Sequence, residues 1–235
     1  MKIYEQKDDE AFVLSGDFDI AIPFSFAIYS DSAEPQIKVF PSLRPLAEEF
    51  AAKFGGALFS DAAIAWAKER FGSYLTEKGF QIGEESDDYF VNYRLENAGG
   101  SILPDTHQVG ETGTLENLTG YDIDALEQFG HLCFATVADG KIVSAACTNS
   151  PVFEDTEGDD IEIGVETAPG YEGRGFGRST VAALSAALRA RGCTALYECA
   201  SKNIASMKLV QALGGREYAR NYYIVGIRTD VQENE

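Results

Sequence analysis

The sequence has few of the residues on which metal sites and redox centres are built. It contains only two histidines and four cysteines, and no two cysteines form a C-x-x-C pair. His107 and His131 have no ligand-like spacing around them, so we expect no metal site. The cysteines lie in apolar stretches, and we expect them to be reduced core thiols. They are Cys133, Cys147, Cys193 and Cys199.

Basic residues are also scarce. Lysine and arginine together number 19 against 38 acidic residues, which gives a formal net charge of −19. Nucleic-acid phosphates are bound by clustered lysines and arginines, so we expect no nucleic-acid partner. An acidic cleft would concentrate a cationic amine. A well-solubilised surface explains the same charge, so the acidity alone names no substrate.

The sequence lacks a long uninterrupted apolar run. The apolar stretch of residues 11–29 is broken by Asp17, Asp19 and Pro23, and the first ten residues mix lysines with acidic residues. We therefore expect neither a membrane span nor a signal peptide, and we expect a cytoplasmic location. No internal repeat is apparent, and nothing in the sequence indicates the oligomeric state.

A strand, a glycine-rich turn and a helix follow one another from residue 160. Residues 161–166 alternate apolar with polar or small side chains, which is typical of a strand. Pro169-Gly170 ends it, glycines recur at positions 173, 175 and 177, and an apolar helical face runs from Val181 to Leu188. Closely spaced glycines at a helix start leave backbone N–H groups accessible, and the helix dipole favours negative charge there. The turn therefore predicts a phosphate or pyrophosphate site.

Two common phosphate-binding turns do not fit this spacing. A dinucleotide-binding turn needs G-x-G-x-x-G directly after its strand, but Arg178 stands where the third glycine would fall when the motif is read from Gly173. A P-loop needs G-x-x-x-x-G-K-[ST], and this turn contains no Gly-Lys pair.

Two motifs in order carry a family resemblance. From position 172 the sequence EGRGFG is similar to [Q/R]-x-x-G-x-[G/A], and further on Asn203, Ser206 and Leu209 precede a Leu213-Gly214 stop, similar to N-x-x-[A/S]-x-x-L-Y-x-x-x-G-F. These are the motifs of the GNAT superfamily of acyl-CoA-dependent N-acetyltransferases. The chain resembles that superfamily over roughly residues 111–228, about half of its length.

The resemblance implies a fold. We expect an α/β protein whose residues 111–235 form a GNAT-like mixed, mostly antiparallel sheet flanked by helices. Thr119 is expected to cap a short helix ending near Gly130, Asp139-Gly140 to form a hairpin turn, and residues 216–228 to form a long closing strand. Residues 1–110, with helices expected at 43–54 and 61–75, form an N-terminal α/β extension or domain. We expect this extension to contribute to the acceptor pocket.

The resemblance also implies where acetyl-CoA binds. In the family, the strand before the glycines diverges from the next strand, and the pantetheine pairs with backbone in that gap; here these strands are 161–167 and 194–200. Amides near Val165 and Thr167 would take the pantetheine, and Asn203 and Ser206 would face the coenzyme from the second helix. The pyrophosphate would lie against the turn, at Arg174, Gly175, Phe176, Gly177, Arg178 and Ser179.

Two positions depart from the family pattern. Glu172 stands where the family usually has Arg or Gln, and a carboxylate about 4 Å from a pyrophosphate charge would cost roughly 4 kcal/mol at an effective dielectric near 20. We expect Glu172 to turn to solvent or to pair with Arg174 or Arg178. Val210 stands where many members carry a tyrosine that protonates the leaving thiolate, so the general acid is either another group or unnecessary.

A base is needed because an amine acceptor is protonated at neutral pH. Glu162 and Glu166 share one strand face opposite the isoleucines, and either could serve, although both could equally be solvated or salt-bridged. We favour Glu162, and we disfavour Cys199 as a covalent acyl carrier because the family transfers the acyl group directly.

The expected function is therefore transfer of an acetyl group from acetyl-CoA to an amine of a small molecule, and an acidic cleft would favour a cationic one. The alternative is a non-catalytic acyl-CoA-binding or sensing protein on the same fold, which Glu172 and Val210 favour. The sequence identifies neither the acceptor nor the preferred acyl chain.

Overall fold

The computed structural model describes residues 1–6, 13–15, 18–32, 34–111, 115–153, 156 and 158–228. The chain forms two compact units. The first unit comprises Met1–Val91, Ala200–Lys202 and Tyr218–Glu235, and the second comprises Asn92–Cys199 and Asn203–Glu217.

This division differs from the predicted boundary at residue 110. Residues 92–110 group with the second unit, and the chain returns to the first unit from Tyr218 onward. The reason is the last strand, β13 (Arg216–Arg228), which begins in the second unit and then pairs with strands of the first. The closing strand itself was predicted with the same bounds.

The sheet of the first unit has the strand order β1-β4-β3-β13. The pairing of β1 with β4 is parallel, whereas β3 pairs antiparallel with both β4 and β13. Two short strands, β2 and β5, add to β3 and β13 respectively. The bounds are β1 (Lys2–Glu5), β2 (Val13–Ser15), β3 (Phe18–Tyr29), β4 (Gln36–Val39) and β5 (Gln81–Ile82).

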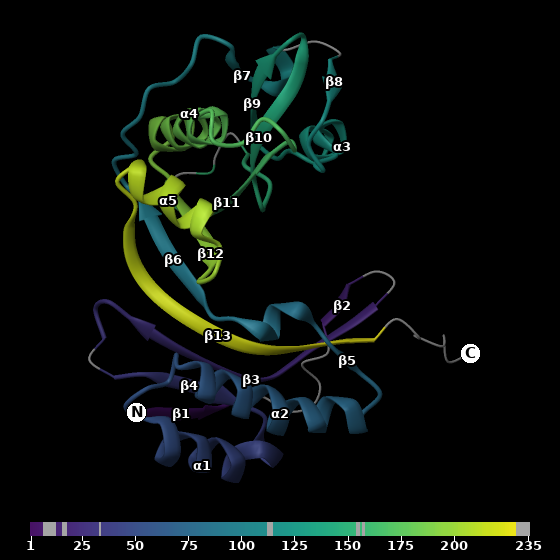
Figure 1. Cartoon of the computed structure of the whole chain (residues 1–235), viewed down its shortest axis with the longest axis vertical. Helices are drawn as coiled ribbons and strands as arrows, with labels where there is room; N and C mark the ends of the chain where they lie inside the picture. The colour runs from purple at the N-terminus through teal and green to yellow at the C-terminus, as the bar shows by residue number, and fades with distance from the viewer. Residues whose placement is uncertain are drawn as a thin grey trace. The chain divides into compact units, whose positions relative to one another are not determined.

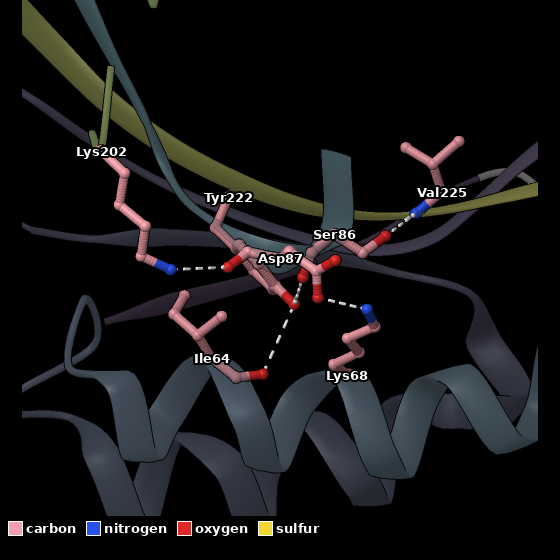
Figure 2. Close-up of polar contacts among 7 residues, drawn as sticks. All are labelled: Ile64, Lys68, Ser86, Asp87, Lys202, Tyr222 and Val225. Carbon is pink, nitrogen blue, oxygen red and sulfur yellow. Dashed lines mark hydrogen bonds and ion pairs between the residues drawn. The ribbon is translucent and has the colours of Figure 1, made fainter. Parts of the chain in front are cut away.

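Two helices of the first unit bury the aromatic core of its sheet (Figure 1). They are α1 (Arg44–Phe54) and α2 (Asp61–Glu77), close to the two predicted ranges, and short 3-10 turns lie at η1 (Pro41–Leu43) and η2 (Glu84–Asp87). Phe24 of β3 stacks on Phe71 of α2 with ring centroids 3.8 Å apart. The ring centroid of Phe26 lies 5.2 Å from that of Tyr222 in β13, so the last strand is part of this core. The Tyr222 hydroxyl also donates to the Ser86 carbonyl at 3.0 Å (Figure 2).

The second unit contains the glycine-rich turn. Its strand order is β12-β11-β10-β9-β7, with β8 added to β10, and β6 (Phe90–Leu95) leads the chain into it. The β10–β11, β9–β10 and β7–β9 pairs are antiparallel, whereas β11–β12 and β8–β10 are parallel. The bounds are β7 (Thr106–Gln108), β8 (Glu116–Asn117), β9 (Cys133–Ala138), β10 (Lys141–Thr148), β11 (Asp160–Thr167) and β12 (Thr194–Ala200).

Helices flank this sheet, so the predicted mixed, mostly antiparallel α/β fold is confirmed. The helices are α3 (Ile123–Gln128), α4 (Phe176–Ala190) and α5 (Ile204–Ala212), preceded by a 3-10 turn, η3 (Val109–Glu111). Helix α4 packs against β9, β10 and β11, and α3 packs against β9.

Two local predictions in this unit have different outcomes. The hairpin turn is confirmed, because Asp139 (φ 52°) and Gly140 (φ 73°) both adopt the left-handed conformation of a type I′ turn. The helix cap was wrong: Asp122, not Thr119, accepts the hydrogen bond of the Ala125 amide at 3.1 Å. Thr119 donates instead to the side chain of Asn117, which holds the loop before α3.

Candidate functional site

Strands β11 and β12 pair for only part of their length. Their parallel register runs from Asp160 opposite Thr194 to Glu162 opposite Leu196, although the strands continue to Thr167 and Ala200. The predicted divergence of these two strands is therefore present, and it begins after Glu162.

Beyond Glu162, the backbone N–H and C=O groups of successive β11 residues point alternately toward β10 and toward the side of β12. The Asn149 amide donates to the Glu162 carbonyl and the Ala168 amide donates to the Val143 carbonyl, each at 2.8 Å. Because of this alternation, the backbone N–H and C=O groups of the even-numbered residues of β11 point toward β10. The N–H and C=O groups of Val165 and Thr167 consequently point to the opposite side, where pairing with β12 has ended. A ligand with its own amides is suited to that side.

The glycine-rich turn ends at the start of α4 without a side-chain cap. Gly170, Gly173 and Gly175 have φ values of 86°, 71° and 88°, a conformation that glycine adopts without steric cost. Gly175 is the N-cap residue and supplies no side chain to the helix start. The amides of residues 175–178 precede the first intrahelical hydrogen bond, so they are the donors that the predicted phosphate site requires.

Ser179 does not share this role, which corrects its assignment to the coenzyme site. Its amide donates to the Gly175 carbonyl at 3.0 Å. Its buried hydroxyl lies 2.6 Å from the Thr106 hydroxyl and accepts the Leu103 amide at 2.8 Å. Both polar groups of Ser179 are therefore used in packing α4 against the residues around β7.

The charged side chains of the turn are exposed. The Arg174 guanidinium lies 4.8 Å from the ring centroid of Phe176 and 5.4 Å from that of Tyr171. The Glu172 carboxylate accepts the Gly170 amide at 2.6 Å. None of the ion pairs found among the described residues joins Glu172 to Arg174 or Arg178. The carboxylate is thus held within its own turn and leaves both guanidinium groups unneutralised by it.

Helix α5 uses one of its predicted coenzyme contacts as a cap. The Asn203 side-chain oxygen accepts the Ser206 amide at 3.1 Å, so the side-chain NH₂ group of Asn203 is its remaining donor. Burial raises the pKa of the Tyr197 phenol, and a hydrogen bond with the Ser206 side chain partly offsets this effect. Val210 is fully buried, so the position where the family often has tyrosine belongs to the packed core here.

The two candidate bases differ in their surroundings. Ile161 and Ile163 are buried and Glu162 is exposed, as the strand alternation predicted. The Glu166 carboxylate accepts the Gly120 amide at 2.8 Å. The Glu162 carboxylate has no hydrogen-bond or ion-pair partner within the described part of the chain. Glu166 therefore anchors a loop, whereas the Glu162 carboxylate is exposed to solvent.

Sequence reasoning missed Tyr121, which lies on the same face of β11. A β-carbon at Gly164, the residue midway between the two glutamates, would overlap the Tyr121 hydroxyl. The side-chain NH₂ group of Asn117 donates a hydrogen bond to the Tyr121 carbonyl at 2.7 Å. Burial, followed by the neighbouring Cys147 and Glu166, raises the pKa of the phenol to about 12. The available signal was Gly164 itself, because a glycine inside a strand often marks the close approach of another group.

Residues 159–224, which carry both motifs, match the family model described as FR47-like protein. The resemblance to the GNAT superfamily is thereby confirmed for this segment. No curated protein matches the chain significantly.

Several solved structures are similar to parts of the chain at low identity. One is a protein assigned to the GNAT family of acetyltransferases from Novosphingobium aromaticivorans, with 20% identity and a TM-score of 0.43 over 59% of this chain and 64% of that chain. A GNAT-family acetyltransferase from Colwellia psychrerythraea has 15% identity and a TM-score of 0.42 over 86% and 80% of the two chains. A Salmonella typhimurium protein assigned as an acetyltransferase, solved with acetyl-CoA, has 20% identity and a TM-score of 0.33 over 47% and 71%. The chain thus spans less than two thirds of the Novosphingobium protein.

Two further features bear on the expectations from composition. Among the residues that the structure describes, no group of three or more His, Cys, Asp or Glu side chains is arranged to hold a metal ion. Over the same residues, no helix combines the length and apolar character needed to cross a membrane.

Proposed function

We propose that the protein is an N-acetyltransferase that moves an acetyl group from acetyl-CoA to an amine of a small molecule. The observation that carries the proposal is the end of β11–β12 pairing at Glu162, next to the uncapped glycine turn at Gly175. Backbone groups of Val165 and Thr167 suit the amides of pantetheine. The free amides of residues 175–178, with Arg174 and Arg178, suit the pyrophosphate.

The proposed chemistry uses the exposed face of β11, which carries Glu162. Glu162 accepts a proton from the ammonium group of the acceptor, directly or through one water. The freed amine nitrogen attacks the thioester carbonyl carbon, the new C–N bond forms, and the C–S bond breaks. The coenzyme leaves as a thiolate, and the second proton, which the attacking nitrogen loses as the neutral amide forms, passes to the thiolate directly or through solvent. The Tyr121 phenol, with its pKa near 12, remains protonated at neutral pH and offers a hydrogen-bond donor on the same face as Glu162.

The second candidate is a protein that binds acyl-CoA without turnover. The burial of Val210 favours it, because no tyrosine at that position can protonate a leaving thiolate. The coenzyme A thiol leaves readily at neutral pH without a general acid. The burial of Val210 is therefore weaker support for this candidate than the strand divergence is for an acetyltransferase.

Thiol release from acetyl-CoA with a panel of small amines separates the two candidates. We expect release that depends on the acceptor, together with a rise in melting temperature when acetyl-CoA is added. A melting shift without thiol release across the panel supports the binding protein. The absence of both effects contradicts the coenzyme assignment.

A further inference from the structure

The Tyr121 side chain lies at the end of a row of residues that crosses three strands of the second unit. Cys133 of β9 lies directly opposite Cys147 of β10, and Cys147 lies directly opposite Gly164 of β11. The ring of Tyr121 packs against the buried cluster that contains both cysteines, and its hydroxyl lies over Gly164. The phenol is therefore held between this cluster and β11.

The loop that carries Tyr121 is fixed by a set of hydrogen bonds. The Gly120 amide donates to the Glu166 carboxylate at 2.8 Å, and the Asn117 side chain donates to the Tyr121 carbonyl at 2.7 Å. The Thr119 amide and hydroxyl both donate to the Asn117 side-chain oxygen, at 2.9 Å and 2.8 Å. A side chain on a loop that is already fixed loses little conformational freedom when it binds a ligand.

The Tyr121 hydroxyl is available to a ligand. Among the described residues, none forms a hydrogen bond with it. Over the same residues, the buried side-chain oxygen that lacks a partner is that of Ser185, so the Tyr121 hydroxyl is accessible although its ring is half-buried. Burial raises the pKa of the phenol to about 12, so at neutral pH the group keeps its proton and offers it as a donor.

This hydroxyl lies close to the candidate base. Gly164 and Glu162 are two positions apart on β11 and face the same side of it, so their α-carbons are about 7 Å apart. Asn149 lies beside both: its amide donates to the Glu162 carbonyl, and its side-chain oxygen is 3.4 Å from the position that a β-carbon at Gly164 would take. One small molecule on this face can therefore meet a carboxylate at one end and the neutral Tyr121 donor at the other.

The group that meets the Tyr121 hydroxyl must accept a hydrogen bond, because a donor that a ligand covers and leaves unpaired costs free energy. An ammonium or methyl group has no lone pair to accept it, and the charges of Glu162 and Glu166 would repel a carboxylate. A neutral oxygen is the group that fits.

We propose that Tyr121 is a specificity-determining residue, and that the acceptor is an amine with a neutral oxygen, a hydroxyl or a carbonyl, close to its reactive nitrogen. The inference rests on the proposed function and deepens it, because it names the chemical class of the acceptor.

The test compares ethanolamine with propylamine, which carries a methyl group in place of the hydroxyl. Thiol release from acetyl-CoA gives kcat/KM for each amine in wild type and in Tyr121→Phe, which keeps the ring. The two amines differ in basicity, so the quantity compared is the ratio of their kcat/KM values, in one protein and in the other at the same pH. We expect Tyr121→Phe to lower the ratio of ethanolamine to propylamine by about 10-fold, equivalent to about 1.4 kcal/mol, with propylamine within about twofold of wild type. Tyr4→Phe removes an exposed phenol hydroxyl from β1 of the first unit and should keep the wild-type ratio.

A second measurement needs no variant. The ether 2-methoxyethylamine keeps the oxygen lone pairs but cannot donate a hydrogen bond, and butylamine is its oxygen-free counterpart. At equal concentrations of free amine, we expect wild type to use the ether about 5-fold better than butylamine. Equal rates with the two overturn the inference, even if Tyr121→Phe does not fold.

Three other outcomes also overturn it. They are an unchanged ratio in folded Tyr121→Phe, an equal fall for ethanolamine and propylamine, and thiol release with other amines of the panel but not with ethanolamine. If acetyl-CoA raises the melting temperature but no amine causes thiol release, the proposed function fails and this inference fails with it.

Discussion

The hydroxyl of Tyr121 occupies the space that a side chain at Gly164 would need. Gly164 lies on β11 between Glu162 and Glu166, so the absence of a β-carbon there leaves room for a phenol on the strand face that carries both glutamates. This close approach depends on one residue and can be tested directly.

Gly164→Ala should displace Tyr121. We expect lower turnover with little change in acetyl-CoA affinity, and a loss of stability of about 1–3 kcal/mol from overpacking. Steady-state kinetics and denaturant unfolding measure both effects. Gly56→Ala is the control, because a β-carbon at Gly56 meets nothing within 4 Å. Equal effects in the two variants would contradict the packing argument.

Replacing Gly175 should abolish the coenzyme-induced melting shift. In Gly175→Leu the side chain covers the amides at the start of α4, and the left-handed conformation at φ 88° is strained for leucine. Gly140→Leu places the same strain, at φ 73°, in the β9–β10 hairpin turn, outside the glycine-rich turn. We expect both variants to melt earlier than wild type and only Gly140→Leu to keep its response to acetyl-CoA. A full response in Gly175→Leu would show that the turn is not the coenzyme site.

Glu162→Gln should reduce turnover roughly 100-fold at neutral pH and leave acetyl-CoA affinity nearly unchanged. The deficit should shrink as the pH rises, because more of the acceptor is already the free amine. Glu166→Gln is the matched comparison: its side chain anchors Gly120, so we expect a smaller kinetic effect and a measurable loss of stability. Wild-type turnover in Glu162→Gln would exclude Glu162 as the base.

Glu172→Arg should tighten acetyl-CoA binding. The Glu172 carboxylate accepts a hydrogen bond from the Gly170 amide. Among the described contacts it forms no ion pair with Arg174 or Arg178, so the substitution breaks none. The gain should be largest at low salt, where screening is weak. Calorimetry at two ionic strengths measures it, with Glu172→Gln separating removal of the negative charge from addition of a positive one. Weaker binding in both variants would mean that the carboxylate shapes the turn.

Stability at high pH should depend on Tyr121. The pKa of its phenol is about 12 in the folded protein against 10.0 for an unperturbed tyrosine, so the folded state retains the proton more strongly. The stabilisation is complete below pH 10 and is lost as the pH rises toward 12. Tyr121→Phe should remove on the order of 1–2 kcal/mol of the decline in unfolding free energy over that range. If the unfolding free energies of the two proteins fell by the same amount between pH 9 and pH 12, this prediction would be contradicted.

The sequence predicted the elements that depend on neighbouring residues and missed the contacts between distant ones. The strand at 160–167, the glycine turn and the helix after it are encoded by local alternation and by glycine, and the structure contains all three. The role of Ser179 could not be read locally, because its partners Leu103 and Thr106 lie more than 70 positions earlier. The same holds for the contact between Glu166 and Gly120, and for Tyr121, whose loop has no periodic pattern.

The course of β13 has a consequence for how the protein is made. Tyr222 and Ile224 belong to the core that Phe24, Phe50 and Phe71 form near the beginning of the chain. During synthesis the first unit therefore waits, with that aromatic surface incomplete, until the second unit has been translated and residues 218–228 have left the ribosome. The part of the chain made first therefore completes its core only with the last strand.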